Sequence, residues 1–196
     1  MNSLRKLAIS ALIVGITGVI AGAASWSAFS GTTSNSGNSF AAGTVSISDN
    51  DSGGTMLSLT NALPGASTTG CIKVSYSGSL SADVKLWGTV SGALGPYLTL
   101  KVTRGTDTGT FPTCSFTADT RDYIGQGAGV IYNGNLSSYP SSYAAGLTDP
   151  ENATGGTESW TNPETHAYKL EVTLQNDSAA QGQSATASFT WEARNQ

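Results

Sequence analysis

The sequence predicts an all-β domain, an antiparallel sandwich or barrel, and three observations lead to this fold class. Apolar and polar residues alternate with a period of two in several segments, as in strands that bury one face. Glycine, which supplies 24 of the 196 residues, and clusters of Asn, Asp, Ser and Pro separate these segments as turns do. Long helical segments alternating with fully apolar strands are not seen, which disfavours a doubly wound α/β fold. The length suits one domain with a substantial core.

The clearest alternation occurs in three segments. Residues 97–103 read YLTLKVT, residues 168–174 read YKLEVTL and residues 185–193 read ATASFTWEA. Each segment places one apolar row on a core and one row of Thr, Lys, Glu or Ser in water. Further strands are expected at residues 39–47, 56–59, 71–76, 83–90, 114–116 and 129–132.

Two segments depart from the strand pattern. Residues 136–146 read LSSYPSSYAAG, which fits one short helix or helical turn, and Pro140 limits it to a few residues. Residues 147–165 are expected to form a long surface loop that contains Trp160.

The N-terminus resembles an export signal. Arg5 and Lys6 precede an apolar run over residues 7–24, and small residues follow. Residues 1–27 are therefore predicted to be a signal peptide that forms an N-terminal helix. Cleavage after Ala23 or after Ser27 fits the small-x-small rule, and an uncleaved membrane anchor is the alternative. Loss of this leader would reduce nine basic residues to seven against 13 acidic ones, a net charge of −6. The expected product is a secreted acidic domain that contacts a membrane only through its leader and does not bind nucleic acid.

Export also bears on the two cysteines, Cys71 and Cys114. An oxidising compartment permits a disulfide between them, which closes a loop of about 43 residues and stabilises the fold by roughly 3–4 kcal/mol. Free buried thiols or an intermolecular bridge are the alternatives.

Few residues are of the types that carry catalysis. His166 is the single histidine, and no HExxH or GxSxG motif is present, so we predict no catalytic residues, no metal ligands and no cofactor. We expect His166 to be an exposed or edge residue at the start of a strand. Asp119 and Asp122 flank Arg121 in a loop, where solvated mutual pairing is expected. Residues 49–54, DNDSGG, predict a turn, with a weak calcium site as the alternative.

Three tryptophans raise the alternative of a carbohydrate-binding platform. Trp191 has the same parity as Phe189 and is expected in the core, whereas Trp87 is expected to face outward and Trp160 to lie in a loop.

Four motifs, three near the start of the chain and one at its end, resemble the TasA/camelysin family of exported bacterial proteins. Residues 24–30 read ASWSAFS, residues 38–47 read NSFAAGTVSI, and residues 57–65 read LSLTNALPG. These are similar to the family's small-Trp-small-Ala-Phe signal junction, its Phe-x-Ala-Gly-Thr strand and its Asn-x-x-Pro-Gly turn. The ending QGQSATASFTWEA at residues 181–193 is similar to the family's last strand.

The resemblance implies a jelly-roll-like sandwich over residues 41–196 and a structural role in fibres of the extracellular biofilm matrix. It favours cleavage by a SipW-type signal peptidase between Ser27 and Ala28. The freed residues 28–40 would then be a flexible donor segment that completes the sheet of the next subunit. Phe29 and Phe40 would be its anchors.

Independently of the resemblance, residues 28–40 are rich in Gly, Ser and Asn and have too little apolar area to fold alone. They can add to a sheet edge by β-augmentation, and a frayed tail is the alternative. Partners would be further copies of the chain, with other matrix or cell-wall components. The acceptor core is expected from five apolar residues: Leu170, Val172, Leu174, Phe189 and Trp191.

Two other functions remain open. Some family members are described as metalloproteases, so a camelysin-type secreted metalloendopeptidase is one alternative, although no matching metal motif is present. A carbohydrate-binding module that uses Trp87 or Trp160 is the other.

Overall fold

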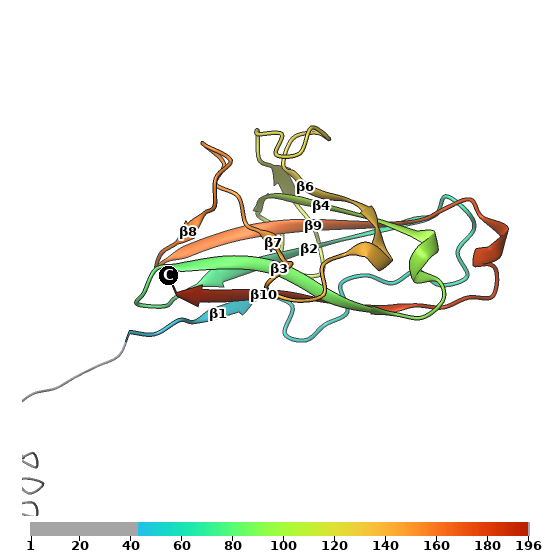
Figure 1. Cartoon of the computed structure of the whole chain (residues 1–196), viewed down its shortest axis with the longest axis horizontal. Helices are drawn as coiled ribbons and strands as arrows, with labels where there is room; N and C mark the ends of the chain where they lie inside the picture. Colours follow the sequence, from blue (N-terminus) through green and yellow to red (C-terminus); the bar gives the residue numbers. More distant parts are fainter. Residues whose placement is uncertain (1–42, 196) are drawn as a thin grey trace, which may run out of the picture. The chain divides into compact units, whose positions relative to one another are not determined.

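A computed structural model of the chain describes residues 43–195 (Figure 1). The predicted signal peptide, the junction at Ser27 and Ala28, and the donor segment with Phe29 and Phe40 lie outside the described residues. Those predictions therefore stay predictions. No helix among residues 43–195 has the length and apolar character needed to cross a membrane.

The first layer of the domain is a six-stranded antiparallel sheet. Its strands follow the order β1 (Ile47–Asp49), β2 (Ser67–Tyr76), β9 (Glu164–Leu174), β4 (Leu98–Asp107) and β5 (Phe116–Ala118), and β6 (Val130–Asn135) also pairs with β4. The long central ladders join β9 to β2 on one side and to β4 on the other. Strand β9 is therefore an interior strand of this sheet.

The second layer is organised around a single strand, β3 (Ala82–Ser91). Strand β10 (Thr186–Asn195) pairs with β3 along its whole length, and β7 (Leu147–Thr148) and β8 (Ser159–Trp160) pair with its other side. The two sheets pack face to face, so the predicted all-β antiparallel sandwich is confirmed (Figure 1).

The core consists of the inward rows of both sheets. On β4 the buried row begins with Leu98, Leu100 and Val102, and on β3 it contains Val84 and Leu86. These rows are the apolar parities that the alternating sequence predicts. Leu170, Val172 and Leu174 of β9 belong to the same core, as expected.

One expectation for the irregular segments is confirmed and two are wrong. Residues 136–146 contain the expected short helical turn, the 3-10 turn η2 (Leu136–Ser138), which ends before Pro140, whose carbonyl accepts a hydrogen bond from the Gly88 amide. Two further 3-10 turns are η1 (Gly95–Tyr97) and η3 (Ser178–Ala180). Residues 56–59 form no strand, and residues 147–165 are not a plain surface loop, since they contain β7 and β8.

The predicted disulfide between Cys71 and Cys114 is present, and the described residues contain no free cysteine. Cys71 lies on β2 and Cys114 in the loop between β4 and β5, where Lys73 Nζ also donates to Gly109 O at 2.8 Å. The disulfide and this hydrogen bond fasten the loop to the outer face of β2. Disulfides of this kind are common in proteins that function outside the reducing cytosol.

Candidate functional site

A groove follows one edge of β10. Within residues 43–195, β10 pairs with β3 on one side and with no strand on the other. Opposite this open edge lie β1 and residues 53–59, and three hollows of 320, 220 and 140 Å³ follow the space between them. Phe189 lines all three hollows, so they form one continuous feature, which we call the β10 groove.

The groove exists because residues 54–59 run beside β2 on the open side of the sandwich without forming a strand of either sheet. Gly70 of β2 permits this path, since a Cβ atom there would lie 2.4 Å from Met56 Cγ and 2.6 Å from Met56 O. Any larger residue at this position would push the segment away from β2. The segment therefore forms one wall of the groove, and β10 forms the other.

The groove is lined by apolar side chains from the predicted acceptor core. Phe189 and Trp191 point inward from β10 but are only half-buried, and Ile72, Val74 and Val172 line the groove from the first sheet. The rings of Phe189 and Trp191 pack edge-on or tilted against Tyr139 and Tyr168 of the core, at centroid distances of 5.5 and 5.4 Å. The groove is thus an open extension of the core.

One polar atom of a groove-lining residue lacks a partner. Among the described residues, Trp191 Nε1 is the buried side-chain nitrogen or oxygen that makes no hydrogen bond. A buried donor without an acceptor costs about 1–3 kcal/mol, so such groups are rare in native structures. Because Nε1 is buried, an acceptor in the groove would reach it after a small rotation of the indole ring.

The predicted turn at residues 49–54 forms part of the groove wall. Asp51 accepts a hydrogen bond from Gly53 N at 2.7 Å, and Asn50 Oδ1 accepts one from Lys73 N at 2.8 Å. These side chains therefore stabilise the turn and its attachment to β2. Burial and the neighbouring Asp51 carboxylate raise the pKa of Asp49, against the lowering effect of a backbone hydrogen bond.

A second feature is a buried charge network centred on Arg104, which we call the Arg104 network. Arg104 continues the inward row of Leu100 and Val102 on β4 and is 2% exposed. Its Nε donates to Asp149 Oδ1 at 3.0 Å and its Nη1 to Asp119 Oδ2 at 2.5 Å. Burial alone would lower the pKa of Arg104, but attraction to Asp149 and the hydrogen bonds to both carboxylates outweigh it and raise the pKa.

Asp149 is the most deeply buried acid of the network, with no exposed surface. Besides Arg104 it accepts hydrogen bonds from Tyr168 Oη at 2.6 Å and Trp160 Nε1 at 2.9 Å. The donors come from β4, β9 and β8, so one carboxylate joins both sheets. Burial, followed by the charge of Asp149, raises the pKa of Tyr168 well above its usual value.

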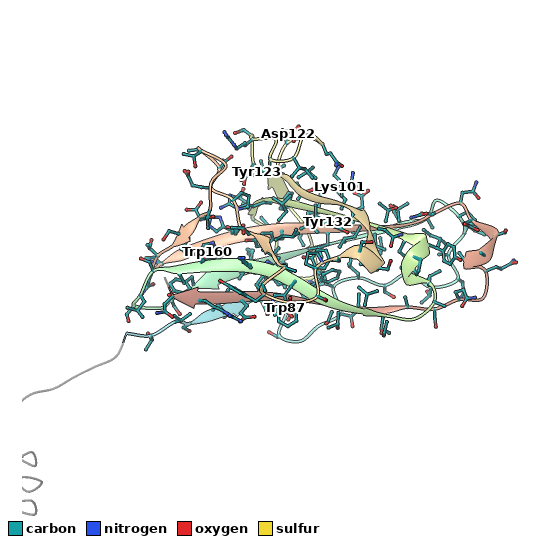
Figure 2. The ribbon with its side chains drawn as sticks, in the orientation of Figure 1. Trp87, Lys101, Asp122, Tyr123, Tyr132 and Trp160 are labelled. Atoms are coloured by element: carbon teal, nitrogen blue, oxygen red, sulfur yellow. A yellow bond between two sulfur atoms is a disulfide. The ribbon has the colours of Figure 1, made fainter. Side chains whose placement is uncertain are left out.

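The expected pairing of Asp119 and Asp122 with Arg121 is wrong. Asp119 is buried against Arg104 and also accepts from Tyr123 Oη at 2.7 Å. Asp122 accepts from the amides of Gln126 and Gly127, as its position in the loop before β6 allows (Figure 2). Arg121 donates to the backbone carbonyls of residues 153 and 154. Backbone amides outcompete Arg121 for Asp122 because the tight loop 122–127 places them nearer.

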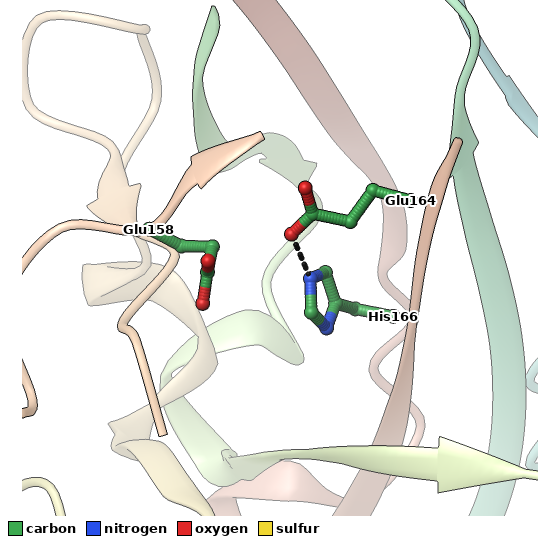
Figure 3. Close-up of side chains that lie close together, drawn as sticks. All are labelled: Glu158, Glu164 and His166. Atoms are coloured by element: carbon green, nitrogen blue, oxygen red, sulfur yellow. Dashed lines mark hydrogen bonds and ion pairs between the residues drawn. The ribbon is translucent and has the colours of Figure 1, made fainter. Parts of the chain in front are cut away.

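Three ligand-type side chains meet beside the network. Glu158 precedes β8, and Glu164 and His166 occupy the inward parity at the start of β9. Their donor atoms lie within 4.8 Å of one another, and His166 Nε2 is 2.7 Å from Glu164 Oε1 (Figure 3). We call these three residues the ligand trio. A hollow of 690 Å³ borders Glu158 and His166 and opens them to solvent.

The position of His166 differs from the expected exposed or edge site. It lies on the interior strand β9, opposite Val74 of β2, and its side chain is 17% exposed. Its ring packs edge-on against that of Trp160 at 4.5 Å, and Nε2 lies 3.2 Å from Arg104 Nη2. The inward parity of β9 explains this position, because it continues the buried row of Tyr168 and Leu170.

The tryptophans do not form the carbohydrate platform that the sequence left open. Trp160 has no exposed surface, because Asp149 binds its indole N–H and β8 holds it inside. Trp87 lies on the outer face of β3, as expected, and donates to Glu192 Oε2 at 3.0 Å (Figure 2). Trp191 lines the β10 groove. The three rings therefore do not share one surface.

Sequence reasoning missed Arg104, Asp149, Glu158 and Glu164 as functional candidates. A signal for two of them exists, since Arg104 and Glu164 have the same parity as the apolar rows of their strands. Asp149 and Glu158 carry no such signal, because they lie in irregular segments outside the alternating strands.

Comparisons with known proteins give no family assignment. No protein-family model matches the chain, and no curated protein is significantly similar to it.

Proposed function

We propose that the chain is a secreted structural protein that forms cell-surface or matrix fibres by donor-strand exchange. In this proposal, residues 28–40 of one copy lie in the β10 groove of the next copy and pair with the open edge of β10. The observation that carries the proposal is this groove: within residues 43–195 the ten-residue strand β10 has one free edge there, and the buried Nε1 of the groove-lining Trp191 has no acceptor.

The backbone of the donor segment supplies what the groove lacks. A free strand edge presents alternating N–H and C=O groups, and an added strand pairs with them whatever its side chains are. Thirteen residues span at most about 45 Å, and ten paired residues need about 34 Å. Residues 28–40 are therefore long enough to cover β10, and one of their carbonyls could accept the Trp191 N–H.

The side chains of the donor segment suit a narrow groove. Most are Gly, Ser, Thr, Asn or Ala, which pass between the walls, and the two phenylalanines can serve as anchors. Phe29 and Phe40 are an odd number of residues apart, so a regular strand turns them to opposite faces. We assign Phe29 to the groove, because Phe40 is only three residues in sequence from Gly43, where the described domain begins.

The leader and the disulfide support an extracellular location. Residues 1–27 have the charge and apolar pattern of an export signal, and the disulfide between Cys71 and Cys114 is typical of an oxidising compartment. The resemblance to TasA/camelysin proteins supports the same location and a role in biofilm fibres. The proposal assigns the chain no enzymatic activity.

The geometry of the exchange determines the kind of assembly. The donor segment and the groove are different surfaces, so a one-way exchange is a heterologous contact that leaves a free groove at one end and a free donor segment at the other. Repetition of such a contact produces a filament. Other matrix or cell-wall components could bind along it.

The test uses the protein exported by an expressing bacterium, with its N-terminal residue determined. We expect a mature chain that begins at Ala28 and forms filaments in electron micrographs in a concentration-dependent manner. Deletion of residues 28–40 is expected to leave monomers that bind a synthetic peptide of residues 28–40.

Two substitutions locate the contact in this test. Ala187→Arg places a long cation in the groove and is expected to abolish filaments and peptide binding, since Ala187 lines two of the hollows. Thr89→Arg, on the exposed outer face of β3, is the matched control and is expected to have no effect. Filaments that survive the deletion, or a chain that stays monomeric at every concentration, would contradict the proposal.

A further inference from the structure

The ligand trio has the composition of a transition-metal site. One imidazole nitrogen and two carboxylate oxygens are the donors that Zn²⁺ accepts, and three protein ligands leave a fourth position for water. Tetrahedral Zn²⁺ with bonds of about 2.0–2.1 Å holds its ligand atoms about 3.3 Å apart. The donor atoms of the trio lie within 4.8 Å of one another, so small side-chain rotations would bring them to this spacing.

The charges around the trio also favour a cation. Among the described residues, Arg104 is the cation in salt-bridge contact with Asp119, Asp149 and Glu158, and Glu164 adds a fourth carboxylate through His166. With a neutral imidazole the formal charge of this half-buried group is −3. Asp119 and Asp149 already have Arg104 and tyrosine or indole donors, whereas Glu158 has the longer 3.3 Å contact with Arg104 and Glu164 contacts His166, so most of the remaining negative charge lies on these two glutamates.

The hydrogen bonds of His166 leave its Nε2 atom in conflict. Nε2 lies 2.7 Å from the acceptor Glu164 Oε1 and 3.2 Å from the donor Arg104 Nη2. A single ring nitrogen cannot donate to the carboxylate and accept from the guanidinium in the same tautomer. A metal ion that binds the Nε2 lone pair removes this conflict. Glu164 then contacts the ion, and Arg104 Nη2 keeps its hydrogen bond to Glu158 Oε2 at 3.3 Å.

The surroundings hold the trio in place. The Trp160 ring packs against His166, and Glu164 Oε2 accepts a hydrogen bond from Thr161 N at 2.6 Å. Ligands fixed by neighbouring groups in this way bind metals more tightly than mobile ones. The 690 Å³ hollow beside Glu158 and His166 provides a path for the ion.

We propose that Glu158, Glu164 and His166 form a binding site for a divalent transition-metal ion of the zinc class. The ion would join the segment before β8 to the start of β9 and so fasten this end of the sandwich. The site is independent of the β10 groove and of filament formation.

Calorimetric titration of the untagged full chain with ZnCl₂ tests the site. The chain suits this experiment, because it has one histidine and its two cysteines form a disulfide. We expect one saturable Zn²⁺ site per chain, a shift of the single imidazole resonance on binding, and a higher melting temperature with Zn²⁺. Mg²⁺ is expected to bind far more weakly, because it prefers six oxygen ligands.

Three variants and one control make the result specific. Glu164→Gln, His166→Gln and Glu158→Gln each remove one ligand with little change in volume, and each is expected to weaken Zn²⁺ binding at least tenfold. Glu171→Gln, on the outer parity of the same strand, is expected to bind as the unaltered chain does. If one variant fails to fold, the other two still decide the question.

Absence of saturable Zn²⁺ binding in the folded chain would overturn the proposal. The same conclusion would follow if the three variants kept full affinity. Equal binding of Mg²⁺ would overturn the assignment to the zinc class.

Discussion

The β10 groove and the Arg104 network are both built on inward-facing residues of the same sandwich, yet they treat polar groups in opposite ways. In the network, Asp149 has no exposed surface and each of its oxygens accepts a hydrogen bond. Beside the groove, the Trp191 N–H is buried without a partner and one edge of β10 is unpaired among residues 43–195. Within that part of the chain, the polar groups of the network are satisfied, and the edge of β10 is open.

Under the proposed function, the network serves stability and the groove serves association. A buried charge group is costly unless every member is satisfied, so its parts depend on one another. An open strand edge costs little while water reaches it, but it binds readily to another strand. Substitutions in the two regions are therefore expected to differ in what they change.

The largest effect is expected for Arg104→Met. The substitution keeps much of the side-chain volume but leaves Asp119 and Asp149 without their common cation, which is expected to cost about 3–5 kcal/mol of unfolding free energy. Urea denaturation of the monomer lacking residues 28–40 measures this value. Lys101→Met, on the outer parity of the same strand, is the control and is expected to change stability by less than about 0.5 kcal/mol. A loss below about 1 kcal/mol for Arg104→Met would mean that the network contributes little to stability.

A smaller effect is expected for Tyr168→Phe, and it depends on pH. Loss of the hydrogen bond to Asp149 is expected to cost about 1.5–3 kcal/mol at neutral pH. The folded pKa of Tyr168 lies above its unfolded value near 10, so its contribution is complete below about pH 10 and is lost as the pH rises further.

The pH dependence separates Tyr168 from the other tyrosines. Between the unfolded and folded pKa values of Tyr168, the unfolding free energy of the unaltered chain is expected to fall with pH. In Tyr168→Phe the slope of this fall is expected to be smaller by the equivalent of one proton. Urea denaturation at a series of pH values measures both slopes. The same slope in both proteins would show that Tyr168 ionises without unfolding.

The smallest effect on the monomer is expected for Trp191→Phe. The indole N–H has no partner to lose among the described residues, so the unfolding free energy of the chain without residues 28–40 is expected to change by less than about 1 kcal/mol. Binding of the 28–40 peptide is expected to weaken about tenfold, because a hydrogen bond formed only in the complex is lost. Fluorescence anisotropy of the labelled peptide measures this change. Unchanged binding would place the donor segment away from Trp191.

Much of the sandwich could be predicted from the sequence, because its long strands bury one face. The alternation at residues 97–103 and 168–174 located β4 and β9, and the parity of Phe189 and Trp191 placed them inward. The failures have a common cause. Residues 147–165 are held by the side chains of Asp149 and Trp160, which bind elements distant in sequence, and such contacts leave no local period.

The candidate site was predictable only in part for the same reason. The groove depends on Gly70, which lets residues 54–59 lie close against β2. The sequence of residues 54–59 does not distinguish this irregular segment from a strand. Arg104 and Glu164 could be found from parity alone. Their convergence on Glu158 and His166 could not, because it depends on how β8 meets β9.

The ten-residue ladder between β3 and β10 has a mechanical consequence. A filament joined through β10 transmits tension into the domain along this ladder. Pulling parallel to the strands strains all the rungs together, whereas pulling across them opens the rungs one after another. Fibres of this protein would therefore withstand stretching much better than sideways peeling, and rupture forces measured in the two directions would differ accordingly.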